Sequence, residues 1–202
     1  MRGGERTQHP SMAGERPTSP EQENEDEPRI YVASLADYNN GRLHGRWLDA
    51  TQEPADLEVH VADVLAASPL PWAEEWAIHD YTGFAGLHID EHEDLKRVSA
   101  IARGIVEHGP AYAAWVAIRN GASENPKDFK DLYLGHWASP AAYAEQFLED
   151  FGALDTLQRH VPAWLRPYVQ LDYASFGHNM EVNGDFAFAA DATGVHVFDG
   201  HG

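Results

Sequence analysis

Apolar and polar positions alternate near residue 30. Ile30 and Val32 alternate with their neighbours, and Leu43 and Trp47 resume the alternation after the run YNNG at residues 38–41. Alternation is typical of half-buried strands, and Asn-Gly is the strongest short hairpin signal. The pattern therefore predicts two antiparallel strands joined by a tight turn.

A helical period follows Pro54. The apolar positions that share one face of this predicted helix are Leu57, Val61, Val64 and Leu65. A strand period then returns at residues 76–80 and is closed by Thr82-Gly83. These elements predict a small three-stranded sheet with one helix over residues 29–90.

The middle of the chain has a helical period. A long amphipathic helix is predicted after the acidic turn at residues 90–94, and Gly109-Pro110 ends it. Its apolar positions are Leu95, Val98, Ile101, Ala102 and Ile105. A second helix is predicted up to Asn120-Gly121 and a third after Pro126. Residues 91–133 are therefore predicted to form a helical module.

The helix predicted after residue 139 has the clearest ends. Ser139 suits the cap, Pro140 suits the first turn, and Gly152 suits a left-handed terminating position. The apolar positions expected to form one buried stripe are Tyr143, Ala144, Phe147, Leu148 and Phe151. Glu145, Glu149 and Asp150 fall largely outside that stripe.

The rest of the chain predicts further helical turns as far as Phe176, a strand at residues 180–182, and a final hairpin. In that hairpin Phe186 and Phe188 pair with Val195 and Val197 around a turn at residues 191–194. Residues 134–202 are thus predicted to form a C-terminal α+β module that contains the helix after residue 139. The predicted fold class is α+β, an elongated chain of three small modules.

Residues 1–28 contain no Ile, Leu, Val or aromatic residue and are predicted to be a disordered acidic leader. The chain has no cysteine, which excludes disulfides and cysteine-ligated metal sites. No apolar run approaches the roughly 18 residues of a membrane span, and the start lacks the apolar core of a signal peptide. We expect a soluble, cytoplasmic protein.

Charge is the outlying property. The chain has 33 acidic and 14 basic residues, a formal net charge of -19. This balance argues against nucleic acid as a direct ligand and favours a partner with a basic surface. Solubility or adaptation to salt explains the same composition. The leader contributes only -4, so the predicted folded part carries -15.

The best candidate for an active site is a cluster of His88, Asp90 and His92, whose histidines share a helical face as metal ligands do. The cluster lacks the Glu that follows the first His in zinc hydrolases, and a solvated helix start explains the same residues. The sequence contains no P-loop, G-x-G-x-x-G or G-x-S-x-G pattern. We expect no catalytic, cofactor-binding or metal-binding residues, with a metal-dependent hydrolase as an alternative.

Several separated blocks resemble one family. YAEQFLEDFGALDTL at residues 143–157 resembles the antirestriction motif of the ArdA family, the DNA-mimicking inhibitors of type I restriction-modification enzymes carried by mobile genetic elements. The other matching blocks, in the same order, are IYVASLADYNNGRLHGRWLDA (30–50), EEWAIHDYTGF (74–84), DLYLGHWAS (131–139) and VNGDFAFAADATGVHVF (182–198).

The resemblance implies an elongated homodimer that occupies the DNA-binding groove of the methyltransferase core of a type I enzyme. It implies inhibition of restriction and, less strongly, of modification, without catalysis or a cofactor. The 26 carboxylates outside the leader equal the backbone charge of roughly 13 base pairs. An acidic adaptor or chaperone for basic DNA-binding proteins is the alternative.

The residues expected to form the DNA-mimicking acidic surface are Asp49, Glu53, Asp56, Glu58, Asp63, Glu74, Glu75, Asp80, Asp90, Glu91, Glu93, Asp94, Glu107, Glu124, Asp128, Asp131, Glu145, Glu149, Asp150 and Asp155. Within the antirestriction motif, four residues are expected to serve packing or dimer contact. They are Tyr143, Phe147, Leu148 and Phe151. Because the charge is distributed, no single acid is expected to be essential.

Overall fold

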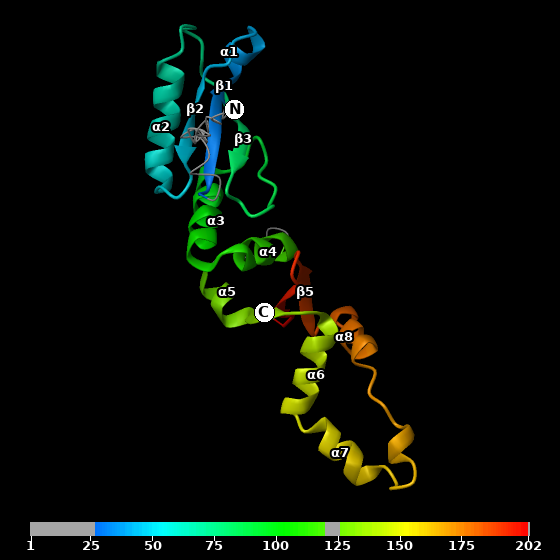
Figure 1. Ribbon diagram of the computed structural model, residues 1–202. Helices are drawn as coiled ribbons and strands as arrows, with labels where there is room; N and C mark the ends of the chain where they lie inside the picture. The colour runs from blue at the N-terminus through cyan, green and yellow to red at the C-terminus, as the bar shows by residue number, and fades with distance from the viewer. Residues whose placement is uncertain (1–26, 120–125, 202) are drawn as a thin grey trace, which may run out of the picture.

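The structure, a computed structural model, describes residues 27–119 and 126–201. Its ribbon is elongated, with the first sheet at one end, helices α3 to α5 in the middle and helices α6 and α7 at the other end (Figure 1). The chain then returns, so that its last hairpin lies beside α4. The described residues contain helices and two three-stranded antiparallel sheets, which confirms the α+β class. None of their helices is long and apolar enough to cross a membrane.

The first sheet confirms the three predicted strands. Strand β1 lies between the other two, and both pair with it antiparallel. Helix α2 packs on this sheet through Leu57, Val61 and Val64, which are buried. The bounds are β1 (Arg29–Ser34), β2 (Gly45–Asp49), α2 (Pro54–Ala66) and β3 (Trp76–Thr82).

The predicted tight turn between β1 and β2 is wrong. The Ser34 side chain accepts a hydrogen bond from the Asp37 amide at 3.3 Å, which starts a short helix α1 (Leu35–Asn39) directly after β1. Asn40 caps the end of α1, and Gly41 follows with φ +73°. The Asn-Gly pair therefore ends a helix, because a helix cap upstream has already turned the chain.

The middle of the chain is helical, as predicted. Asp94 caps α3 (Leu95–His108) by accepting from the Lys96 amide at 2.7 Å, and Gly109 separates α3 from α4 (Pro110–Arg119) with φ +69°. Helix α5 (Pro126–Leu132) places Phe129 in the core. The predicted break at Asn120-Gly121 lies outside the described residues.

The C-terminal part confirms the helix after Ser139 and the final hairpin. Ser139 accepts from the Ala142 amide at 3.1 Å, and Gly152 has φ +63°. The second sheet has the order β4-β6-β5. The bounds are β4 (Tyr133–Trp137), α6 (Pro140–Asp150), α7 (Ala153–His160), a 3-10 turn η1 (Arg166–Tyr168), α8 (Tyr173–Val182), β5 (Phe186–Ala190) and β6 (Val195–Asp199).

The predicted strand at residues 180–182 is wrong, because these residues end helix α8. Asp172 caps this helix by accepting from the Ser175 amide at 3.0 Å. Gly177 lets α8 approach α6 closely, since a Cβ at this position would lie 2.7 Å from the Pro140 carbonyl oxygen. The third strand of the second sheet is instead β4, which pairs with β6.

Buried apolar residues form two clusters. The larger runs from β1 through α5 and includes Phe198 of β6. The smaller one comprises Tyr143, Ala144, Met180, Val195 and Val197. Strand β6 supplies both clusters, because its successive side chains point to opposite faces of the sheet. The division into three modules at residues 90 and 133 stays a prediction.

Candidate acidic interface

Helix α2 begins the acidic surface. Its buried positions face the first sheet, so Asp56, Glu58 and Asp63 on its other faces are exposed. Asp49 at the end of β2 and Glu53 before the helix are exposed as well. The amphipathic pattern that folds this helix also fixes where its carboxylates lie.

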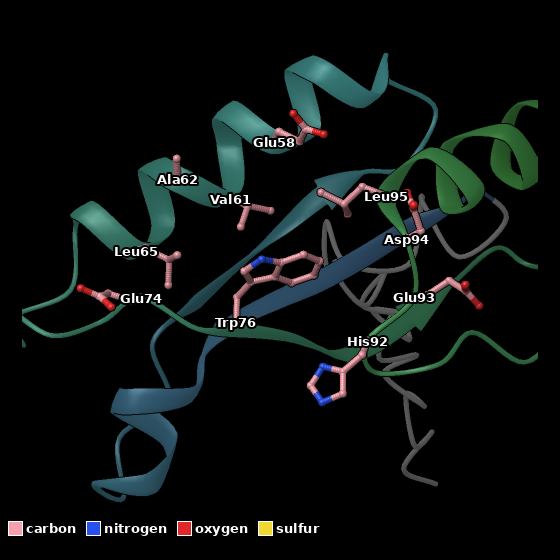
Figure 2. Close-up of a pocket in the computed structure, with 10 residues that line it drawn as sticks. All are labelled: Glu58, Val61, Ala62, Leu65, Glu74, Trp76, His92, Glu93, Asp94 and Leu95. Carbon is pink, nitrogen blue, oxygen red and sulfur yellow. The ribbon is translucent and has the colours of Figure 1, made fainter.

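A shallow groove of about 630 Å³ lies between α2, the start of β3 and the start of α3. Figure 2 shows Trp76 in this groove, with Glu58 and Glu74 on one side and His92, Glu93 and Asp94 on the other. Trp76 packs against the larger core. An aromatic ring surrounded by carboxylates suits a guanidinium or ammonium group, which gains from both the charges and the ring face.

Several acids of this surface are paired with cations. Glu53 binds Arg103, Glu93 binds Arg97, and Lys130 donates to Glu107 at 2.7 Å. The hydrogen bond from Lys130 is the main reason why the pKa of Glu107 is lowered. Paired carboxylates add little net field, so these three contribute less to an acidic surface than their unpaired neighbours do.

The predicted metal cluster of His88, Asp90 and His92 lies in the segment between β3 and α3. The structure does not bring its three side chains together. His88 Nδ1 lies 3.1 Å from the Tyr81 hydroxyl, while Asp90 accepts from the backbone amide of His92. His88, Asp90 and His92 do not form one of the groups of metal-ligating atoms found in the described residues. Their positions give the alternative of a metal-dependent hydrolase no support.

The far end of the molecule carries a second set of exposed acids. Glu145, Glu149 and Asp150 lie on the open side of α6, and Asp155 lies on α7. Gln146 donates to Asp150 at 2.8 Å. Acidic residues are thus exposed at both ends of the elongated ribbon (Figure 1).

The remaining predicted acids are placed as follows. Glu74, Glu75, Asp80, Asp90, Glu91, Asp94, Glu107 and Asp131 are exposed, whereas Glu93 and Asp128 are half-buried. Glu124 lies outside the described residues. The sequence pattern missed Glu181, which is exposed on α8. A helical interpretation of residues 173–182 would have placed it, because the buried Gly177 and Met180 define the packed face.

The antirestriction motif packs unevenly. Tyr143 is buried among Trp137, Phe186 and Phe188, and this burial raises the pKa of its hydroxyl. Phe147 and Leu148 are half-buried. Phe151 is 74 % exposed, contrary to the predicted buried stripe, because it follows the last helical residue of α6. The stripe therefore anchors α6 as far as Phe147, which packs on Phe186, but not at Phe151.

Comparison with known proteins identifies one family. The sequence profile of the antirestriction protein (ArdA) family matches residues 30–194, from the start of the first sheet to the turn before β6. A search of curated proteins gives no match. This family is known for antirestriction and not as a family of enzymes. Because the match covers most of the sequence, the chain belongs to the antirestriction protein (ArdA) family.

Proposed function

We propose that this antirestriction protein acts as a mimic of double-stranded DNA. In this proposal it binds the DNA-binding groove of a type I restriction-modification enzyme and inhibits restriction and, less strongly, modification. It acts by occupying the groove of the methyltransferase core in the cytoplasm, without catalysis, and its gene belongs to a mobile genetic element. Nucleic acid is not its ligand.

The observation that carries the proposal is the distribution of exposed carboxylates along the length of the ribbon. They extend from Asp56 and Glu58 on α2 at one end, through Asp131 on α5 in the middle, to Glu149 on α6 and Asp155 on α7 at the other end, and these helices are labelled in Figure 1. Duplex DNA presents about one negative charge per 1.7 Å of its axis to proteins that track it with Lys and Arg. An elongated acidic protein offers the same cations a comparable line of charge.

The groove around Trp76 supports this proposal at the level of single side chains. The exposed carboxylates of Glu58, Glu74 and Asp94 line it together with the indole ring (Figure 2). A long basic side chain of the target enzyme fits such a groove, with its methylene stem against Trp76 and its charge among the carboxylates. Lys and Arg residues that otherwise bind DNA phosphates have this chemistry.

A homodimer is part of the proposal. Large apolar side chains are exposed near the end of the ribbon that carries α6 and α7, among them Phe151, Trp164 and Tyr168. Contiguous exposed apolar side chains are typical of protein interfaces. Pairing two chains at this end would leave the carboxylates of α2 and the groove accessible in both copies and would lengthen the acidic surface.

Competition tests the proposal directly. The purified protein is added to a complex of a type I methyltransferase core with a labelled duplex, and displacement is followed by fluorescence anisotropy. We expect stoichiometric displacement with an apparent affinity that falls as salt rises. Absence of displacement from several type I cores at low salt would contradict DNA mimicry and leave an acidic adaptor as the better description.

A matched pair of variants separates surface position from net charge. The first neutralises five acids around α2 and the groove: Asp56, Glu58, Asp63, Glu74 and Glu75. The second neutralises the five acids at positions 21, 23, 25, 26 and 27 of the leader. We expect at least a tenfold loss of competition for the first and little change for the second. Equal losses would show that only total charge matters.

A further inference from the structure

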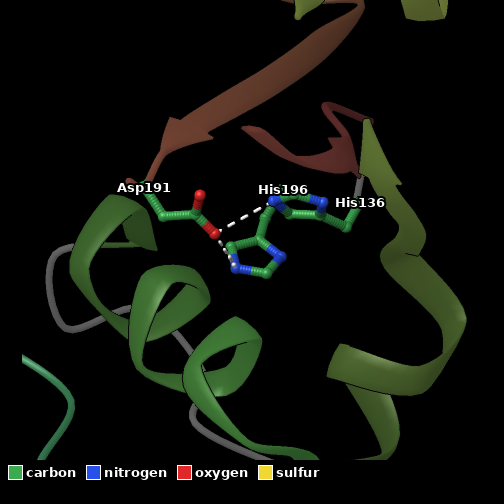
Figure 3. A group of neighbouring side chains, drawn as sticks. All are labelled: His136, Asp191 and His196. Carbon is green, nitrogen blue, oxygen red and sulfur yellow. Dashed lines mark hydrogen bonds and ion pairs between the residues drawn. The ribbon is translucent and has the colours of Figure 1, made fainter. Parts of the chain in front are cut away.

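Three side chains from separate segments meet at one edge of the second sheet. His136 lies on β4, His196 lies directly opposite it on β6, and Asp191 lies in the turn between β5 and β6. Figure 3 shows both imidazole rings beside the same carboxylate. Each residue offers one potential metal-ligand atom, and all three atoms lie within 4.8 Å of one another.

The distances suit a small divalent cation. Asp191 Oδ2 lies 3.0 Å from His136 Nε2 and 3.2 Å from His196 Nε2. Zinc binds imidazole nitrogen and carboxylate oxygen at about 2.0 to 2.2 Å, so neighbouring ligands of a tetrahedral ion lie about 3.3 Å apart. Both carboxylate–imidazole distances are within a few tenths of an ångström of this spacing, and all three ligand atoms lie within 4.8 Å of one another.

The turn fixes the Asp191 carboxylate in place. Its Oδ1 atom accepts hydrogen bonds from the Thr193 amide at 2.6 Å, the Gly194 amide at 2.8 Å and the Thr193 hydroxyl at 2.9 Å. This leaves Oδ2 directed at the two histidines. Gly194 is required for the approach, because a Cβ there would lie 2.1 Å from the Trp137 carbonyl oxygen and 2.9 Å from His136 Cε1.

His196 is oriented by a second contact. It is only 8 % exposed, and its Nδ1 atom lies 3.1 Å from the Tyr133 hydroxyl. Its Nε2 atom is buried and faces Asp191 Oδ2 at 3.2 Å, but among the described residues it makes no contact with hydrogen-bond geometry. Metal-ligating histidines commonly use one ring nitrogen for an outer hydrogen bond and the other for the metal, which is the division seen here.

Space for a further ligand lies next to the three residues. A cavity of about 400 Å³ between α4, the loop before α3 and the last hairpin is lined by Asp191 and His196. On its other side it is lined by His88, Ala113 and Ala117. A water molecule in this cavity would complete a four-coordinate site.

We propose that His136, Asp191 and His196 form a binding site for a first-row divalent metal ion, with zinc as the best fit. Two imidazoles and one carboxylate favour such ions over Mg²⁺ and Ca²⁺, which prefer oxygen ligands. The ion links β4 to the β5–β6 hairpin and thereby stabilises the second sheet, on which α6 packs. This proposal is independent of DNA mimicry, and it replaces the expectation that the chain has no metal ligands.

Calorimetric titration of the chelator-treated full chain with Zn²⁺ tests the site. We expect one equivalent to bind to the wild type and at least a tenfold weaker affinity for His136→Gln and for His196→Gln. The matched control is His201→Gln, because His201 also lies near two carboxylates, Asp199 at 3.3 Å and Asp185 at 3.8 Å, but belongs to no three-residue group in the described residues.

Two further readouts keep the result interpretable. Circular dichroism is used to check that the His136→Gln variant is folded. We expect that it is, because the His136 side chain is partly exposed and lies outside the turn. Zinc is expected to raise the melting temperature of the wild type and of His201→Gln but not of His136→Gln, while Mg²⁺ raises none. Absence of stoichiometric zinc binding to the wild type, or unchanged binding to folded His136→Gln, would overturn the proposal.

Discussion

The two ends of the molecule differ in how completely they bury their apolar side chains. At the first end, Ile30, Val32 and Leu57 are completely buried in the larger core. At the other end, α7 and η1 contain no buried residue, and Trp164 and Tyr168 are 74 % and 79 % exposed. Exposed acids occur at both ends, so charge does not distinguish them. Exposed aromatic side chains also occur at both ends, since Tyr38 and Trp72 of the first end are 57 % and 61 % exposed. The difference therefore teaches that the ends are distinguished by the packed core beneath the surface, to which α7 and η1 contribute no buried side chain.

The largest effect is expected from the core that joins the middle helices. Trp115 is fully buried against Tyr112 and Phe129. Trp115→Ala should lower the free energy of unfolding by about 3–5 kcal/mol, through lost transfer energy and the cavity left behind. Urea unfolding measures it. The control Trp164→Ala removes the same side chain from an exposed site and should change stability by about 0.5 kcal/mol or less. Similar losses for both would refute the contrast between the packed larger core and the exposed end.

A smaller effect is expected where α6 and α8 cross. Gly177→Ala places a methyl group 2.7 Å from the Pro140 carbonyl oxygen, so the helices must separate. Overpacking of this kind costs about 1–3 kcal/mol, which outweighs the gain in helix propensity from Gly to Ala. Thermal unfolding checks it, with exposed Asn179→Ala in the same helix as the control. A Gly177→Ala protein as stable as the wild type would mean that the two helices tolerate separation.

Lowering the pH should destabilise the first end of the molecule, because Asp37 becomes protonated. This carboxylate is buried and accepts from the Ser68 hydroxyl at 2.6 Å, and that hydrogen bond is the main cause that lowers its pKa. Its contribution to stability is therefore full above the unfolded pKa of about 3.9 and is lost as the pH falls through the lower native pKa.

Urea midpoints measured from pH 7 down to pH 2 check this expectation. Asp37→Asn should be less stable than the wild type at pH 7, and the difference should shrink below about pH 4. Asp63→Asn, which alters an exposed acid of α2, should follow the wild type throughout. A constant difference between Asp37→Asn and the wild type across this range would exclude the ionised carboxylate as the cause.

The smallest effect on stability is expected at the exposed apolar end, where association should respond instead. Trp164→Ser combined with Tyr168→Ser should leave the urea midpoint nearly unchanged, because both side chains are exposed in the single chain. Sedimentation velocity should show a shift from dimer to monomer. An exposed aromatic pair changed at the other end, Tyr38→Ser with Trp72→Ser, serves as the control. A dimer that survives the first pair would place the dimer contact elsewhere.

The sequence predicted elements whose signals are local. Ser139, Pro140 and Gly152 mark both ends of α6 within the helix itself, and the period after Pro54 was sufficient for α2. It overlooked two local helix caps, at Ser34 and Asp172, and it missed β4, whose structure depends on a distant contact. Strand β4 exists because Tyr133 to Trp137 pair with β6, about sixty residues later in the chain.

The candidate sites show the same limit. The placement of the acids on α2 and α6 followed from helical periods, since an acid opposite a buried face is exposed. The cluster of His136, Asp191 and His196 was invisible, because 55 residues separate the first two and no spacing rule connects them. His88 and His92 are only four positions apart and gave a stronger sequence pattern. In the structure they contact different residues, Tyr81 for His88 and Glu91 for His92.

The central position of β6 also bears on how the protein is made. This strand pairs with both β4 and β5 and sends Phe198 into the larger core, yet it is the last strand in the chain. A ribosome therefore releases α6 and its neighbours before the strand that completes their sheet. The second sheet therefore closes only after β6 has been made, about sixty residues after β4, whereas the first sheet is complete at Thr82. The two ends of the acidic surface are built in two stages, and β6 decides the second.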